Sequence, residues 1–228
     1  MLDSSARRLV PGGVGKRALA RLVTLLVTGL VTGLLTGMLT GCSEEQKAAP
    51  DPDPTPITKL DTPAMQVPRI EFCTSVPPGA ISDALDGKPE SETAYGNGDE
   101  EELPGIGPEI GTDVVHEIGC SWTGAGGTAA RAWVFARPVE GPFAETVIAA
   151  GAKTEGCRTV PGPAYGKPAA TQLCLFPGGE QRVRHAGLFG QTWLTCELAA
   201  TGGEPAELRV RADRWCVEVA NALDTARR

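Results

Sequence analysis

Hydrophobic and polar positions divide the chain into three parts. Residues 22–41 form an uncharged run of apolar, glycine and threonine residues behind a basic stretch, and residues 43–68 are polar and rich in proline. A charge-free run behind basic residues is typical of an export signal, and a polar, proline-rich stretch is typical of an extended tether. We therefore expect a signal peptide over 1–41, an attached tether over 42–68 and one folded domain over 69–228.

The end of the apolar run specifies the kind of signal. Its last residues and the cysteine after them, Leu39-Thr40-Gly41-Cys42, resemble a bacterial lipobox. The resemblance implies that the Cys42 thiol takes up diacylglycerol before the signal is cleaved, and that the resulting lipid anchor carries palmitate. An uncleaved membrane helix is the alternative, because twenty residues can span a bilayer, although the glycines and threonines weaken it. In both cases the domain lies outside the cytoplasmic membrane, because the basic flank stays inside. Arg7-Arg8 leaves twin-arginine export open.

Short alternating patterns predict the strands of the domain. Apolar residues alternate over Val114–Trp122 and again over Arg131–Arg137, which indicates two adjacent strands. Shorter strand patterns follow near Thr171–Phe176, Gln181–Ala186 and Gln191–Leu198, separated by glycine-rich turns. We expect an antiparallel sheet of about five short strands.

Helical spacing of apolar residues predicts a helix at the C-terminus and two shorter ones. The last helix begins at Pro205 and keeps one apolar face as far as Leu223, and weaker patterns cover Ala80–Leu85 and Pro142–Ala152. Residues 88–111 are too rich in glycine, proline and acid to predict a regular element. The fold class expected is α+β, with a C-terminal helix and one or two further helices on the sheet.

Six cysteines remain beyond the anchor. An even number in an exported chain predicts three disulfides, and the absence of close Cys-x-x-Cys pairs argues against zinc, so no metal is expected. Six cysteines allow 15 pairings, and local elements favour the sequential one. The expected pairs are Cys73 with Cys120, Cys157 with Cys174 and Cys196 with Cys216.

Charge excludes one class of partner and singles out one loop. Of 21 bases and 28 acids, five bases and one acid lie in residues 1–41, so the remainder has 16 and 27. A chain this acidic lacks the positive surface needed to bind nucleic acid. Acids concentrate between Asp83 and Glu117, and their densest part forms a candidate loop for Ca²⁺ or a basic partner, although its spacing is not that of an EF-hand. This acidic loop consists of Asp99, Glu100, Glu101 and Glu102.

Residues suited to catalysis are few. No Gly-x-Ser-x-Gly motif occurs, and the histidines, His116 and His185, both fall on predicted strands, where a structural role is usual. No glycine pattern fits a nucleotide loop, so we expect no cofactor. Three tryptophans close to cysteines, Trp122, Trp193 and Trp215, are expected in the core, whereas Trp133 is open between core and ligand platform.

The order of these features resembles a known class of protein. A first cysteine before a short helix, a strand ending in Cys120-Ser121-Trp122 and a last helix containing Cys216 are similar to small actinobacterial lipoproteins whose C-terminal domain has no known function. A more distant likeness is to the extracellular sensor domains of actinobacterial receptor kinases. The resemblance implies an α+β envelope domain without established chemistry.

Two functions are therefore open. The first is a non-catalytic module, lipid-anchored at the outer face of the cytoplasmic membrane, that binds an envelope protein, a glycan or a small ligand. The alternative is an envelope hydrolase or remodelling enzyme that uses His116 with carboxylates such as Asp113 and Glu117. Convergence of these three side chains on a pocket would favour the enzyme.

Overall fold

The computed structural model of the protein describes residues 55–103 and 111–226. These described residues belong to one compact unit, and the core described below lies wholly within it. The predicted signal peptide, Cys42 and the tether as far as residue 54 lie outside the described residues. Within the described part of the chain, no helix is both long and apolar enough to cross a bilayer.

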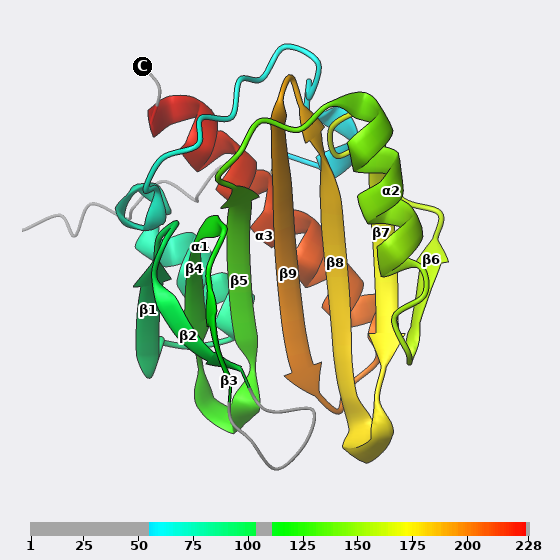
Figure 1. Ribbon diagram of the computed structural model, residues 1–228. Helices are drawn as coiled ribbons and strands as arrows, with labels where there is room; N and C mark the ends of the chain where they lie inside the picture. Colours follow the sequence, from blue (N-terminus) through cyan, green and yellow to red (C-terminus); the bar gives the residue numbers. More distant parts are fainter. Residues whose placement is uncertain (1–54, 104–110, 227–228) are drawn as a thin grey trace, which may run out of the picture. The chain divides into compact units, whose positions relative to one another are not determined.

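A seven-stranded antiparallel sheet forms the centre of the domain (Figure 1). Its strands, in spatial order, are β1 (Ser91–Tyr95), β4 (Glu117–Thr123), β5 (Ala129–Phe135), β9 (Thr192–Thr201), β8 (Glu180–Phe189), β7 (Ala169–Leu175) and β6 (Cys157–Val160). The expected antiparallel sheet is confirmed, but the estimate of about five strands was too low. The two additional strands are the edge strands β1 and β6, which are short and mostly exposed and therefore show no buried alternation.

The acidic region also contains regular structure, contrary to expectation. Strands β2 (Glu100–Leu103) and β3 (Gly111–Val114) pair as a separate antiparallel hairpin between β1 and β4 in the chain. Backbone pairing does not require an apolar face, so composition gave no signal for these strands. The strand expected over Val114–Trp122 is interrupted at Val115 and His116, and only its second part, β4, belongs to the large sheet.

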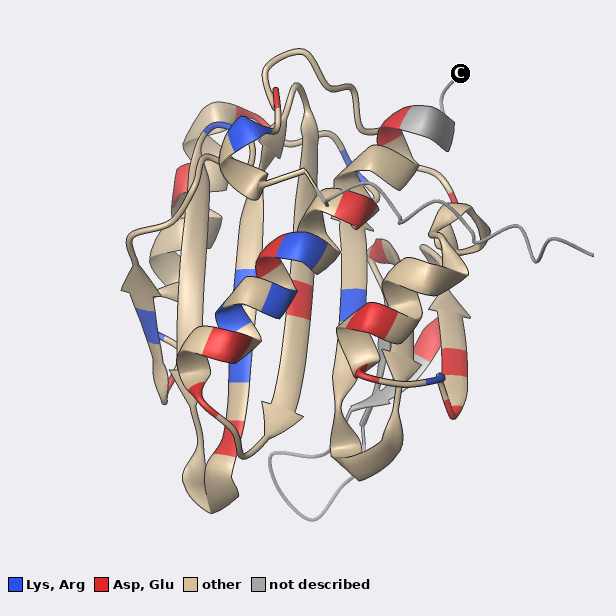
Figure 2. Ribbon diagram, turned by 180° about the vertical axis from the view of Figure 1, so that it is seen from behind, with Lys and Arg blue, Asp and Glu red and all other residues tan. Residues whose placement is uncertain are grey.

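Helices cover the two faces of the sheet unequally. Helix α3 (Pro205–Ala226) crosses one face diagonally with α1 (Pro78–Leu85) beside it (Figure 2), and α2 (Gly141–Gly151) lies on the other face near β7 and β8 (Figure 1). The three expected helices are thus present. Helix α1 ends where Asp86 adopts a left-handed conformation, with a φ of 56°.

The main core fills the space between the sheet and α3. Trp122 of β4 and Trp215 of α3 meet edge to face with ring centroids 5.4 Å apart. Leu194 and Leu198 of β9 are fully buried in the same cluster. Trp193 is also buried, in a smaller cluster beneath α2, so the three tryptophans expected in the core are there.

The folded domain begins earlier than expected. Ile57 and Val67, both placed in the tether by their proline-rich surroundings, are buried in the main core. The Val67 carbonyl also accepts a hydrogen bond of 2.7 Å from the Thr192 hydroxyl. Proline content therefore placed the domain boundary too late in the chain. Isolated apolar residues between the prolines are enough to pack this segment against the domain.

Three disulfides brace these elements with the sequential pairing that the local elements favoured. Cys73 is joined to Cys120, Cys157 to Cys174 and Cys196 to Cys216. The first bond ties the turn before α1 to β4, the second joins the edge strand β6 to its neighbour β7, and the third joins β9 to α3.

Candidate functional site

The face of the sheet opposite α3 carries a row of charged side chains at its centre. On β9, Cys196 points toward α3, because it is bonded to Cys216 of that helix, so the adjacent Glu197 points to the other face. Glu197 is opposite Arg131 of β5 on one side and Arg184 of β8 on the other. The sheet register alone therefore brings these three charges together.

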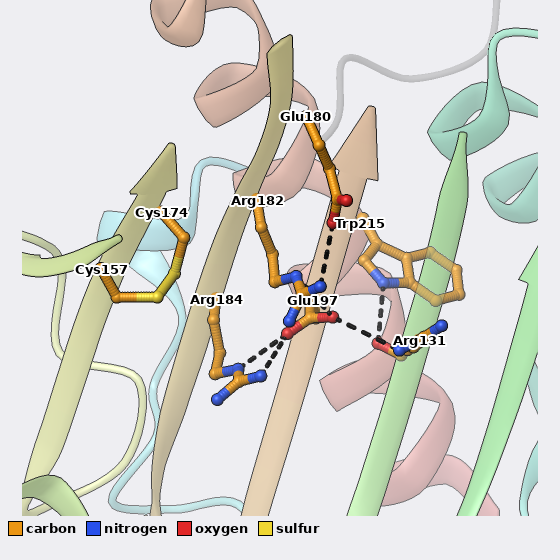
Figure 3. A network of polar contacts seen from close by, with 8 residues as sticks. All are labelled: Arg131, Cys157, Cys174, Glu180, Arg182, Arg184, Glu197 and Trp215. Atoms are coloured by element: carbon orange, nitrogen blue, oxygen red, sulfur yellow. Dashed lines mark hydrogen bonds and ion pairs between the residues drawn. A yellow bond between two sulfur atoms is a disulfide. The ribbon is translucent and has the colours of Figure 1, made fainter. Parts of the chain in front are cut away.

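Glu197 is the centre of this group (Figure 3). Its side chain is 2% exposed, and Arg184 donates two hydrogen bonds to its Oε2, of 2.8 Å from Nε and 2.6 Å from Nη2. Arg182 places Nε 3.4 Å from Oε1, and Arg131 places Nη1 3.9 Å from the same oxygen. Arg182 also contacts Glu180 at 3.0 Å. We call Arg131, Arg182, Arg184 and Glu197 the arginine cluster.

An aromatic residue extends this cluster along β5. Trp133 lies two residues after Arg131 on the same face, and the Arg184 guanidinium carbon is 5.4 Å from its ring centroid. Gly119 of β4 leaves space for the side chains of Trp133 and of Tyr95 in β1. A Cβ atom at Gly119 would lie 2.5 Å from Tyr95 Cζ and 2.7 Å from Trp133 Cβ. Trp133 is half-buried, which lies between the two alternatives expected from the sequence, a core residue and an exposed ligand platform.

Beyond Trp133, the same face ends in a pocket of about 460 Å³. Its lining residues come from the start of β4, the end of β5 and the beginning of α2. They are His116, Glu117, Phe135, Arg137, Pro138, Val139 and Phe143. Phe143 is 54% exposed, which is unusual for a residue with so large an apolar side chain. The pocket thus combines an apolar wall with three ionisable groups.

The structure brings part of the predicted catalytic set to this pocket. His116 and Glu117 both line it, whereas Asp113 lies in β3 and its side chain is outside the described residues. His116 is exposed and lies between β3 and β4, not on a strand as expected. Among the described lining residues, none offers a hydroxyl or thiol nucleophile, and no hydrogen bond from a described residue orients the His116 imidazole.

The other histidine has a structural position. His185 of β8 is fully buried, with Nε2 2.7 Å from Asp213 Oδ1 and Nδ1 3.0 Å from the Thr171 hydroxyl. The order Thr171 hydroxyl, His185 imidazole and Asp213 carboxylate is that of an activated nucleophile. Thr171 is buried, however, and a Cβ atom on Gly162 would lie 2.0 Å from the Thr171 hydroxyl oxygen. The chain therefore covers this hydroxyl, and the contacts attach α3 to the sheet.

A second pocket lies against α3. It measures about 410 Å³ and is formed where the start of the described chain meets the helix. Its lining residues are Thr55, Pro56, Ile57, Thr58, Val210, Asp213 and Arg214. The carboxylate in it, Asp213, is already bound to His185, so this pocket has fewer polar groups available for a ligand.

The acidic loop predicted from composition is divided by the fold. Asp99 lies in the turn before β2, where its Oδ2 accepts a 2.6 Å hydrogen bond from the Gly96 amide. Glu100, Glu101 and Glu102 belong to β2, and the side chains of the last two are outside the described residues. No group of three metal-ligating side chains occurs among the residues that the structure describes.

The arginine cluster was missed from the sequence. Arg182 and Arg184 alternate with Gln181, Val183 and His185 on a predicted strand, which indicates that both face one side. That signal was available, but the partner Glu197 becomes a neighbour only through the pairing of β8 with β9.

Comparisons with known proteins assign the chain to no group. No protein-family model matches it, and no curated protein is similar to it.

Proposed function

We propose that the protein is a lipid-anchored cell-envelope protein whose domain, outside the cytoplasmic membrane, binds a ligand without catalysing a reaction. The lipobox resemblance at Cys42 supports the anchor. Three disulfides support an oxidising location, because such bonds persist mainly in exported proteins. The likeness to small actinobacterial lipoproteins agrees with both parts of the proposal.

The pocket between β5 and α2 is the observation that carries the binding role. Its volume of about 460 Å³ falls within the range usual for small-ligand sites, which are mostly apolar with a few polar groups for orientation. Phe135, Val139 and Phe143 provide the apolar wall, and Arg137 provides a charge at its edge. Exposure of Phe143 is costly in water, and a ligand that covers the ring would remove that cost.

A neutral apolar probe tests this role. We expect N-phenylnaphthylamine to gain fluorescence when added to the domain, residues 50–228, and Phe143→Ser to weaken that binding at least about threefold by removing apolar contact area. Leu175→Ser is the matched control, because Leu175 is 48% exposed and lies outside the pocket. Absence of probe binding, or equal loss in both variants, would contradict the assignment of the pocket.

One observation favours the alternative of an envelope hydrolase or remodelling enzyme. His116 and Glu117 line the same pocket and could exchange protons with a bound substrate. Incubation of the domain with purified envelope glycan, followed by mass spectrometry of the soluble products, tests this function. Products that disappear in a His116→Asn variant would establish the enzyme and overturn the non-catalytic proposal.

A further inference from the structure

The arginine cluster has more positive charge than its own carboxylates neutralise. Three guanidinium groups surround Glu197, and Glu180 contacts one of them. Among the side chains that the structure describes, two carboxylates thus contact three guanidinium groups, in a chain that is otherwise acidic. Like charges held this close repel one another, so an additional anion at the cluster would be stabilised.

Arg131 is the guanidinium that an external anion would reach. Its side chain is 50% exposed, and its contact with Glu197, at 3.9 Å, is too long for a hydrogen bond. Arg184 already satisfies the other oxygen of Glu197 with two hydrogen bonds. The described residues therefore occupy the Arg131 side-chain donors only weakly, although these donors lie at the centre of the sheet face.

Trp133 gives this position a second kind of contact. Arg131, Trp133 and Phe135 alternate along β5 and project to the same face, so the ring lies between the cluster and the pocket. The Arg184 guanidinium lies over the ring at 5.4 Å. A charge and a half-exposed aromatic ring side by side suit a ligand with an anionic group on a ring that has an apolar face.

We infer that Arg131, Arg184 and Trp133 bind an acidic sugar, that is, a sugar ring bearing a carboxylate or a phosphate. The guanidinium groups donate to the oxyanion, which arginine binds with paired hydrogen bonds, and the indole packs against the ring. This inference rests on the proposed binding function and names the chemistry of its ligand. A neutral sugar would leave the excess charge unmatched, and an acidic peptide would not use the aromatic ring in the same way.

Calorimetric titration of the domain, residues 50–228, tests the inference. The probes are tetragalacturonate for the carboxylate, mannose 6-phosphate for the phosphate, tetragalactose as the neutral sugar and tetraglutamate as the acidic peptide. We expect binding of at least one acidic sugar, at least about tenfold weaker binding of the neutral one, and a loss of affinity at high salt. The tighter of the two acidic sugars identifies the anionic group.

Two matched variants locate the site. Arg131→Gln is expected to weaken acidic-sugar binding roughly tenfold, the usual value of a charge-assisted hydrogen bond. Arg158→Gln changes the net charge equally on the exposed edge strand β6 and is expected to leave binding within about twofold. Trp133→Leu is expected to weaken the acidic sugar while leaving tetraglutamate unaffected, because only the sugar contacts the ring.

Several outcomes would overturn the inference. These are no binding of either acidic sugar, equal binding of the neutral sugar or of tetraglutamate, and equal losses in Arg131→Gln and Arg158→Gln. The phenylnaphthylamine titration keeps this result separate from the proposed function. If that probe still binds and the acidic sugars do not, the ligand chemistry is wrong and the binding role stands.

Discussion

Arg184 and Glu197, on neighbouring strands, are joined by two hydrogen bonds to a single carboxylate oxygen, of 2.8 and 2.6 Å. The carboxylate is almost completely buried, and Arg131 and Arg182 contact its other oxygen. A buried charge is tolerated when paired in this way, and each partner then depends on the others. The centre of the exposed sheet face is therefore organised by one acidic residue.

Replacing that acid is expected to destabilise the domain. Glu197→Gln leaves three guanidinium groups with one exposed carboxylate, and we expect a loss of roughly 2 to 4 kcal/mol in the free energy of unfolding. Urea denaturation followed by tryptophan fluorescence measures it. Glu180→Gln is the control, because Glu180 contacts the same Arg182 but is 46% exposed, and its loss should stay below about 1 kcal/mol. Equal effects would show that Glu197 has no special role.

The disulfides are expected to differ in importance although they close loops of similar length. Cys196–Cys216 spans 20 residues and Cys157–Cys174 spans 17, so chain entropy assigns each roughly 3 kcal/mol. Cys196 and Cys216 are both buried in the main core, so replacing these two cysteines by alanine also leaves a cavity beneath α3.

Thermal unfolding of the two double alanine variants compares these bonds. We expect the pair lacking Cys196–Cys216 to unfold at the lower temperature, because it loses core packing as well as the cross-link. The reverse order would mean that the sheet edge at β6, not the attachment of α3, limits the stability of the domain.

Alkaline pH is expected to unfold the domain through Tyr165. Burial raises the pKa of its phenol above the ordinary value of 10.0, and the hydroxyl donates a 3.0 Å hydrogen bond to the Cys216 carbonyl. Because the unfolded state releases this proton more readily, stability is full below about pH 10 and falls as the pH rises above it. Absorbance at 295 nm reports tyrosine ionisation, and circular dichroism reports unfolding. One of the two tyrosines should ionise in the same pH range in which the circular dichroism of the folded domain is lost.

Tyr165→Phe separates that effect from general alkaline denaturation. The variant loses the hydrogen bond to Cys216 and is less stable at neutral pH by about 1 kcal/mol. It should also lose less stability than the wild type between pH 9 and about 11.5, because the group that titrates is gone. Parallel stability curves for the two proteins would contradict the assignment.

The anchor is tested by metabolic labelling. In its host, the full chain should incorporate an alkyne analogue of palmitate and sediment with membranes, because one cysteine-linked diacylglycerol with an amide-linked chain holds a protein to a bilayer. Cys42→Ala should abolish the label and leave the uncleaved signal attached. Labelling that persists in this variant would disprove the lipobox interpretation.

Local patterns predicted the elements in which one face is buried. The alternation of Ile118, Cys120 and Trp122 and the helical spacing from Leu208 to Leu223 reflect contact with the same core. The edge strands β1 and β6 were missed because neither buries a face, and proline obscured the packing of Ile57.

The candidate site was less predictable than the fold. Arg182 and Arg184 could be placed on one side of a strand, and Glu197 on another strand, from alternation alone. The contact between these arginines and Glu197 depends on the register in which β8 pairs with β9. A shift of that register by one residue would move Glu197 to the opposite face of the sheet. The pocket likewise joins His116 to Phe143 through the arrangement of β4, β5 and α2.

The proposed ligand-binding face is tested most directly by the amide spectrum of the ¹⁵N-labelled domain, residues 50–228, before and after addition of a solvent extract of the host's envelope. We expect shifts to concentrate on the face opposite α3, at Arg131, Trp133, Phe135 and the start of α2, with no new product in the extract. Shifts confined to the pocket at Thr58 and Val210, no shifts at all, or turnover of an extract component would contradict this expectation.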